Sequence, residues 1–193
     1  LRTGEPVFDI LARAFMPTFW LSFCALAWSL IFGLIVGVVS AVRQGSVADH
    51  AGMLTAVSGI SMPNFWLGLL LMQFFSVQLG WFGTSGFDKP TDLILPAITL
   101  GSGVAAVMAR FTRSAVIEVV REDYIRTARA KGLPKRRIMF VHAIPNALHP
   151  VIMNMGVRFD YMIKGELEIA IVLGIPTLGP LIINSVGERD MYV

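Results

Sequence analysis

The chain has 193 residues, of which 55% are hydrophobic and 15% are charged, and its formal net charge is +3. Soluble domains typically carry about 25% charged residues. This composition therefore excludes an ordinary soluble enzyme, because the chain has too few charges to cover a water-exposed surface.

Four apolar segments predict an all-α, multi-pass membrane protein. The first covers 15–42, which is 28 residues without a charge, whereas a helix needs about 20 to cross a bilayer. It contains Gly33 and Gly37, whose G-x-x-x-G spacing permits close packing of two helices in a membrane. Residues 1–14 are expected to be an extracytoplasmic segment that leads into this span. Further spans are expected at 54–79, 93–118 and 146–173.

Two features complicate this pattern of spans. Pro63 lies inside the second predicted helix, where neighbouring helices can satisfy the carbonyl group that proline frees. The third span reaches Arg110 and Arg113, whose long side chains are expected to extend toward the membrane interface. The glycine- and proline-rich segment 174–193 is interpreted as a loop or a re-entrant element.

The positive charges predict the orientation. Nine of the 16 Lys and Arg residues fall between Arg110 and Arg137, and cytoplasmic loops of membrane proteins are enriched in these residues. With this block in the cytoplasm, the first span runs inward and the loop at 80–92 lies outside. A basic block between apolar spans also argues against nucleic acid as a partner.

Signatures of enzymatic chemistry are absent from the sequence. It has no G-x-x-x-x-G-K-[ST] phosphate-binding loop, no G-x-S-x-G and no H-E-x-x-H. Cys24 is the single cysteine, so an intrachain disulfide is excluded. His142 and His149 lie seven residues apart without a third ligand nearby. We therefore expect no catalytic residue, no metal and no cofactor in this chain.

The segment 119–145 between the third and fourth spans carries the most information. Glu122 and Asp123 favour a helix start, and Gly132, followed by Leu-Pro, favours a helix end. The small residues Thr127, Ala128 and Ala130 make the helix narrow, so another protein can approach it closely. The residues alone leave two interpretations open: a docking element for a partner, or an ordinary solvated basic loop.

The motif RTARAKG (126–132), followed by HAIPNALHP (142–150), resembles the EAA loop of ABC-importer permeases. Arg126, Thr127, Ala128 and Gly132 occupy the first motif positions, and Pro145 lies near the motif's end. Other segments agree with the same family in order: SGISMPNFWLG, LPAITLG, MARFTR, REDY and IPTLGPLIINSVGERD. The resemblance covers about residues 15–193. It indicates the dipeptide, oligopeptide and nickel branch, most closely the permease subunit of glutathione importers.

This resemblance implies a type I ABC-importer transmembrane domain over 15–193, of which the sequence is an incomplete part. The family's first and last helices are expected to lie outside it. The implied partners are a second homologous permease subunit, cytoplasmic ABC ATPase subunits that hold ATP and Mg, a periplasmic solute-binding protein and membrane lipid. The implied ATPase-coupling residues are Tyr124, Arg126, Thr127, Ala128, Ala130, Lys131, Gly132 and Pro145.

The fourth span carries charges at spacings that place them on one helical face. Asp160, Lys164 and Glu168 follow at i, i+4 and i+8 with alternating sign, so neighbours can pair. A helix that starts at Asn146 carries Lys164, Glu166 and Glu168 to the outer interface.

Arg158 and Asp160 lie deeper in the same span, where charged side chains should face protein or water. They are interpreted either as lining the substrate path or as an internal ion pair. The uncharged polar residues Ser61, Asn64 and Asn154 either line the path or form interhelical hydrogen bonds.

The predicted function is that of a permease subunit that moves glutathione or short peptides across the bacterial inner membrane, driven by a separate ATPase. The alternative within the family is a dipeptide, oligopeptide or nickel permease. Two alternatives outside it are a secondary transporter or channel, and a membrane-anchored scaffold whose basic loop binds anionic lipid.

Overall fold

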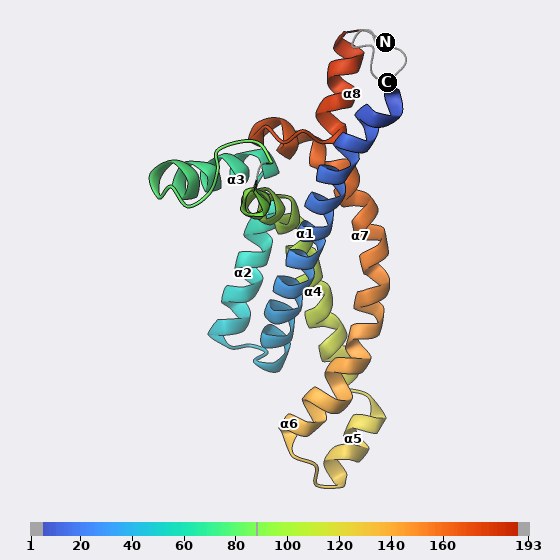
Figure 1. Ribbon diagram of the computed structural model, residues 1–193. Helices are drawn as coiled ribbons and strands as arrows, with labels where there is room; N and C mark the ends of the chain where they lie inside the picture. The colour runs from blue at the N-terminus through green and yellow to red at the C-terminus, as the bar shows by residue number, and fades with distance from the viewer. Residues whose placement is uncertain (1–5, 88, 189–193) are drawn as a thin grey trace. The chain divides into compact units, whose positions relative to one another are not determined.

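The computed structural model describes residues 6–87 and 89–188. Within these residues the chain is helical and has no strand (Figure 1). The α-helices are α1 (Val7–Val42), α2 (Val47–Ser61), α3 (Asn64–Leu71), α4 (Ile94–Val120), α5 (Asp123–Ala130), α6 (Lys135–Arg137), α7 (Ile144–Leu173) and α8 (Leu178–Gly187). Two π-helical segments, η1 (Met72–Gln78) and η3 (Ile138–Ala143), and a 3-10 turn, η2 (Pro90–Leu93), join them.

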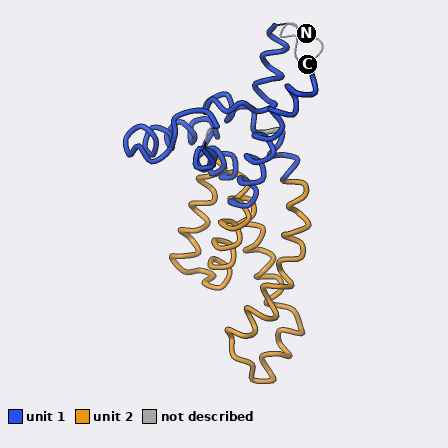
Figure 2. Tube along the Cα trace, viewed as in Figure 1, with its two compact units in different colours: residues 1–28, 62–102, 159–193 blue, residues 29–61, 103–158 orange. Residues whose placement is uncertain are grey.

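The chain divides into two compact units (Figure 2). Unit 1 comprises residues 1–28, 62–102 and 159–193, and unit 2 comprises residues 29–61 and 103–158. Helices α1, α4 and α7 each contribute residues to both units. The first five and last five residues, which belong to the predicted segments 1–14 and 15–193, lie outside the described part.

Unit 2 is built on close approaches between α1 and α4. A Cβ atom at Gly33 would lie 2.6 Å from the Cβ of Met108, and one at Gly37 would lie 2.6 Å from the Cβ of Thr112. Only glycine permits helices to pack this closely. The predicted role of the G-x-x-x-G pair is therefore confirmed. Small side chains from α2 and α4 form the adjoining core, which consists of Ala56, Ala106 and Ala109, with Val36 and Met53 packed against it.

Unit 1 joins the start of α1 and of α4 to α3, the end of α7 and α8. A Cβ at Gly68 on α3 would lie 3.2 Å from the Cγ2 of Thr99 on α4. After α7 the chain turns through Gly174, whose φ of +64° favours glycine. Residues Glu166–Leu173 and helix α8 then meet at an angle of 82°. The segment expected to be a loop or a re-entrant element thus contains a helix, and the bend before it fits either a broken span or a re-entrant element.

The second predicted helix, 54–79 with Pro63 inside it, differs from the structure in two respects. Helix α2 begins at Val47, and the helix breaks at Met62 and Pro63 before α3 begins. Proline has no N–H to donate, and Pro63 has an extended backbone (ψ 133°), so it starts a new helix rather than continuing the old one.

Two helical stretches in the described part are long and apolar enough to cross a membrane, namely Val7–Val42 and Pro90–Val120. The number rises to four if each of two bent pairs forms one span: Val47–Ser61 with Asn64–Gln78, and Glu166–Leu173 with Leu178–Gly187. The exact membrane boundaries stay a prediction. Helix α1 begins at Val7 and so starts before the span expected at 15–42.

Candidate functional site: the coupling segment and its support

The candidate site is the segment around α5 in unit 2, between α4 and α7. Helix α5 follows Glu122, whose extended backbone (ψ 150°) ends the preceding turn, and it carries Asp123 in its first turn. Arg126 Nη1 donates to Asp123 Oδ1 at 3.1 Å, and the Thr127 hydroxyl donates to the Asp123 carbonyl at 3.0 Å. The predicted short helix in this segment is confirmed, including its acidic start.

The end of α5 is a Schellman motif centred on Gly132. The Gly132 N–H donates to the Arg129 carbonyl at 2.9 Å, and the Leu133 N–H donates to the Ala128 carbonyl at 3.3 Å. Gly132 has a φ of +76°, in the left-handed region that disfavours residues with a Cβ. The requirement for glycine is conformational, because a Cβ at this position would meet no atom within 4 Å.

Helix α5 has one buried face and one exposed face. Ile125 is fully buried and Ala128 is nearly so, and α5 contacts η3 on this side. The other seven predicted coupling residues are exposed: Tyr124, Arg126, Thr127, Ala130, Lys131, Gly132 and Pro145. The burial of Ala128 corrects the expectation that it forms part of the narrow docking surface. Its small side chain instead lets α5 pack against the rest of unit 2.

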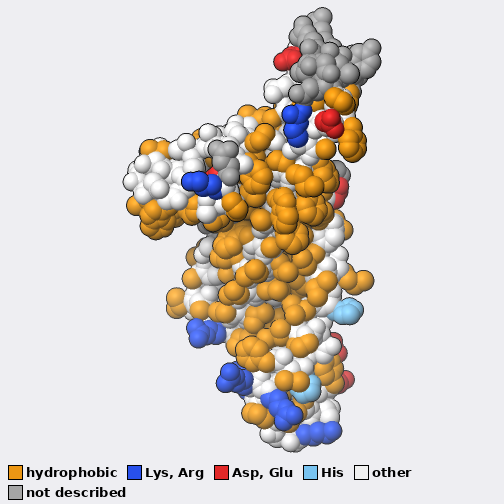
Figure 3. All heavy atoms as spheres, in the orientation of Figure 1, with side chains coloured by type: hydrophobic (Ala, Val, Ile, Leu, Met, Phe, Trp, Pro, Cys, Tyr) orange, Lys and Arg blue, Asp and Glu red, His pale blue; other side chains and the backbone are white. Residues whose placement is uncertain are grey.

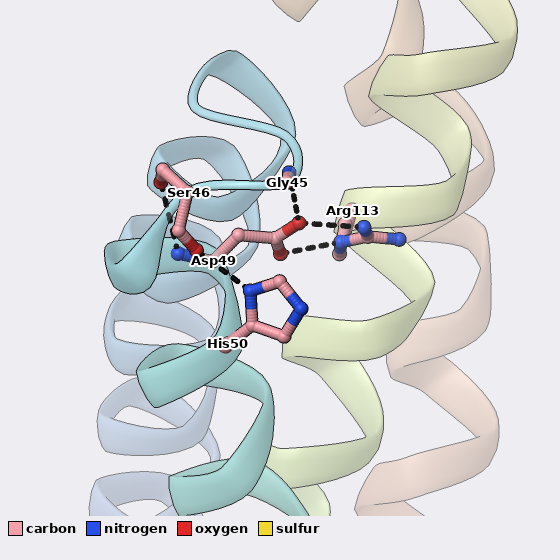
Figure 4. A network of polar contacts seen from close by, with 5 residues as sticks. All are labelled: Gly45, Ser46, Asp49, His50 and Arg113. Carbon is pink, nitrogen blue, oxygen red and sulfur yellow. Dashed lines mark hydrogen bonds and ion pairs between the residues drawn. The ribbon is translucent and has the colours of Figure 1, made fainter.

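A partly buried ion pair ties α2 to α4 within the same unit (Figure 4). Arg113 Nε lies 2.7 Å from Asp49 Oδ1, and Arg113 Nη2 lies 2.7 Å from Asp49 Oδ2. Asp49 is only 3% exposed. The expectation that Arg113 extends toward the membrane interface stays a prediction. The structure adds that Asp49 holds its guanidinium in a two-pronged contact, which is both strong and geometrically specific.

Asp49 also closes the turn between α1 and α2. Its Oδ2 accepts a hydrogen bond from the Gly45 N–H at 3.0 Å, while its own N–H donates to the Ser46 hydroxyl oxygen at 3.3 Å. His50 Nδ1 lies 2.8 Å from the Ser46 carbonyl oxygen. Hydropathy reasoning missed this network. The available signal was Ser46 three residues before Asp49, a typical helix-start pattern.

The residues predicted to line a substrate path have different environments. In unit 2, Arg158 Nε donates to Asn154 Oδ1 at 3.3 Å, and both side chains are half-buried. The Ser61 hydroxyl donates to the Val57 carbonyl of its own helix at 2.9 Å. In unit 1, Asn64 is half-buried at the start of α3, and Asp160 is exposed. Of this group, the structure brings together Asn154 and Arg158.

Glu166 in unit 1 contradicts the prediction that it reaches the outer interface. It is 2% exposed, and its Oε1 accepts hydrogen bonds from the Thr18 hydroxyl at 3.2 Å and the Gly179 N–H at 3.4 Å. Thr18 in turn accepts a bond from the Leu178 N–H at 2.9 Å. Glu166 and Thr18 thus satisfy the N–H groups at the start of α8, which an ordinary helix leaves open.

The remaining charges of the fourth span follow the prediction only in part. Glu168, which was also expected at the outer interface, is exposed. The Lys164 side chain lies outside the described residues, so the expected pairing with Asp160 and Glu168 stays a prediction.

Among residues 6–87 and 89–188, no three His, Cys, Asp or Glu side chains come together in a way that would hold a metal ion.

The sequence matches the family model described as "Binding-protein-dependent transport system inner membrane component" over residues 29–192. It is 50% identical over 189 residues to the glutathione transport system permease protein GsiC of Pectobacterium atrosepticum. It is 46% identical to the protein of the same name from Escherichia coli K12. Each match covers 98% of this chain and 62% of the relative, so the chain spans less than two thirds of the length of these relatives.

Two solved structures resemble the fold. An inward-facing MetNI methionine ABC transporter gives a TM-score of 0.75 at 21% identity, covering 94% of this chain and 82% of that one. An amino acid ABC transporter with histidines gives a TM-score of 0.72 at 19% identity, and the match covers 95% of this chain and 82% of that one. These two likenesses concern the fold alone. Together with the family match and the long apolar helices, they lead to one conclusion: the chain belongs to the family of inner membrane components of binding-protein-dependent transport systems.

Proposed function

We propose that this chain is part of the permease subunit of an ATP-driven importer that carries glutathione or short peptides inward across the inner membrane. The observation that carries the proposal is the 46–50% identity, over 98% of the chain, to relatives named as glutathione transport permeases. The expected partners are a second homologous permease, cytoplasmic ATPase subunits and a periplasmic solute-binding protein.

Helix α5 is the element through which the ATPase acts in this proposal. Its exposed face offers Tyr124, Arg126 and Thr127 to a partner, while Ile125 on its other face is buried. Because α5 contacts η3, and η3 leads directly into α7, a displacement of α5 would be passed to a long helix. ATP and Mg bind in the ATPase subunits, and this chain contributes the mechanical contact.

Arg158 is the side chain that we assign to substrate recognition in unit 2. Glutathione and short peptides carry carboxylates at neutral pH, and a guanidinium binds a carboxylate through parallel hydrogen bonds. The hydrogen bond to Asn154 holds Arg158 Nε, and its two terminal nitrogens are left for a solute. Uptake by an Arg158→Gln variant, compared at equal membrane levels, tests this role. An unchanged affinity and rate would contradict it and favour a structural role.

The experiment for the function as a whole is uptake of labelled glutathione, a dipeptide and nickel by cells that carry the complete set of importer genes, with and without this gene. Selective loss of glutathione uptake is the expected result. Loss of dipeptide or nickel uptake instead would keep the fold and the coupling mechanism but replace the substrate. No loss for any of the three would contradict the proposal and favour a transporter or scaffold of another kind.

A further inference from the structure

A cavity of about 510 Å³ lies in unit 2 beside the coupling segment. Its apolar lining includes Val42 at the end of α1, Ile117 near the end of α4, and Ile138 at the start of η3. Its lining also contains three cations: Arg121 after α4, Arg129 on α5, and Lys135 on α6. A cavity whose lining combines apolar side chains with three cations suits a ligand with an anionic head and an apolar tail.

No acidic residue lines this cavity to offset its positive charge. Within residues 6–87 and 89–188, neither an ion pair nor a side-chain hydrogen bond engages Arg121, Arg129 or Lys135. By contrast, Arg113 is paired with Asp49, and Arg126 with Asp123.

One of the three cations also faces acidic residues. Arg121 borders a neighbouring hollow that contains Glu118, Glu122 and Asp123. Arg129 and Lys135 do not line that hollow. The positive charge of the cavity therefore depends most on Arg129 and Lys135, because Arg121 lines both the cavity and the acidic hollow.

An exposed apolar stripe on α1 leads to the cavity. It is formed by Ile31, Ile35, Val39 and Val42, which are all exposed. Their spacings of four, four and three residues place them on one face of the helix. At 1.5 Å per residue the stripe is about 16 Å long, which matches half of the roughly 30 Å hydrocarbon thickness of a bilayer. One acyl chain in one leaflet has this length.

We propose that this cavity binds an anionic phospholipid of the cytoplasmic leaflet. The phosphate lies among Arg121, Arg129 and Lys135, and an acyl chain follows the stripe on α1 from Val42 toward Ile31. Basic pockets between membrane helices on the cytoplasmic side are suited to anionic head groups. The lipid would join the ends of α1 and α4 to α5 and α6. The inference rests on the inner-membrane location of the family and on the predicted cytoplasmic placement of the basic block.

The distribution of side chains agrees with this proposal. In Figure 3, Lys and Arg side chains gather around α5 and α6, whereas apolar side chains cover the adjacent stretches of the long helices. Such a boundary between apolar and basic surface is where lipid head groups meet a membrane protein.

The test compares two variants of the full-length permease in the assembled importer. The first combines Arg121→Gln, Arg129→Gln and Lys135→Gln. The matched control combines three exposed cations outside the cavity, with the same loss of charge: Arg110→Gln, Arg136→Gln and Arg137→Gln. The measurement is native mass spectrometry of phosphatidylglycerol retained after detergent extraction, with phosphatidylcholine as the neutral comparison.

We expect the cavity variant to retain at least about tenfold less phosphatidylglycerol than wild type, because it removes three charge-assisted hydrogen-bond donors to the bound phosphate, which the control leaves in place. The control should lose less than about twofold. Equal losses in both variants would overturn the proposal, since they would indicate general electrostatic attraction. Displacement of the lipid by millimolar glycerol phosphate would also overturn it, in favour of a soluble phosphorylated ligand.

A second measurement uses wild-type protein and so does not depend on the variants folding. Photoactivatable phosphatidylglycerol should label peptides that contain Val39–Val42 and Ile117–Arg121, and should leave the loop around Trp81 unlabelled. Labelling that avoids the cavity peptides would contradict the proposal. Protection of Val39 and Val42 by a second permease subunit, detected by protein cross-linking at these positions, would contradict it as well.

Discussion

The Asp49 carboxylate and the Arg113 guanidinium meet through two parallel contacts of 2.7 Å, although the two residues lie 64 positions apart in the sequence. This pair joins the start of α2 to α4 and also holds the turn after α1 through the Gly45 N–H. Helix α5, the predicted coupling element, begins at Asp123, soon after α4 ends.

Replacing Arg113 by glutamine should destabilise the protein, because it leaves the Asp49 carboxylate without the cation that it meets through two contacts. Arg110→Gln is the matched control, since Arg110 is exposed and lies one turn earlier on the same helix. Denaturant unfolding of the purified permease measures the free energy of unfolding of both variants. The double variant Asp49→Asn with Arg113→Gln should lose less unfolding free energy than the two single variants lose in sum. Additive losses would show that the two side chains do not act as a pair.

The Schellman motif at the end of α5 predicts a cost for any side chain at Gly132. Gly132→Ala should lose about 1–2 kcal/mol of local stability, because a Cβ disfavours its φ of +76°. Gly156 also has open space around its Cβ position, and it lies inside helix α7 with no positive φ. Gly156→Ala should therefore be neutral or slightly stabilising.

Hydrogen exchange of the peptide that contains Ala128–Leu133 measures the effect at Gly132 directly. Faster exchange of the Gly132 and Leu133 amides in Gly132→Ala, but not in Gly156→Ala, is the expected result. If exchange is equal in wild type and Gly132→Ala, the motif does not hold the end of α5. In the coupling proposal, Gly132→Asp should also abolish stimulation of the ATPase while the permease remains inserted in the membrane.

Close packing of α1 on α4 predicts a steric penalty at Gly37. A Cβ there would approach the Ala109 carbonyl oxygen and the Thr112 Cβ to 2.6 Å each. Gly37→Ala should cost about 1–3 kcal/mol, since the helices must separate to admit the methyl group. Gly156→Ala again serves as the control. A thermal unfolding midpoint unchanged from wild type would show that this contact tolerates a side chain.

Glu166 and Glu168 form a natural comparison because one is buried and the other exposed. Glu166→Ala should destabilise the protein by about 2 kcal/mol, because the Thr18 hydroxyl and the Gly179 N–H lose a buried acceptor. Glu168→Ala should change stability by no more than about 0.5 kcal/mol. Thermal unfolding of the two variants measures the difference, and equal effects would contradict the assigned role of Glu166 at the start of α8.

Helical periodicity, glycine spacing and charge distribution were enough to predict the all-helical fold, close helix packing at Gly33 and Gly37, and the boundaries of α5; that α4 is the partner helix came from the structure. These features depend on residues close together in the sequence, such as Gly33 with Gly37, or the stop at Gly132 and Pro134. The start of α2 at Val47 was missed because Asp49 and His50 look like a polar link when hydropathy is the criterion.

The long-range polar contacts were beyond the reach of sequence reasoning. The partners Asp49 and Arg113, and likewise Thr18 and Glu166, meet only because separate helices pack together. A charged side chain in an apolar segment can either extend to the interface or be buried with a partner. Hydropathy does not distinguish these two arrangements. Glu166 was accordingly assigned to the interface although it is buried and hydrogen-bonded, and the partner of Arg113 was not foreseen.

The most direct test of the central claim is site-specific cross-linking from the exposed face of α5. A photo-cross-linking amino acid is placed at Thr127 in the full-length permease, and at Trp81 as an exposed control predicted to lie on the opposite side of the membrane. Our account predicts a cross-link from Thr127 to a cytoplasmic ATPase subunit, identified by mass spectrometry, and none from Trp81. An intact importer in which Thr127 forms no cross-link to the ATPase, or in which Trp81 forms one equally well, would contradict it.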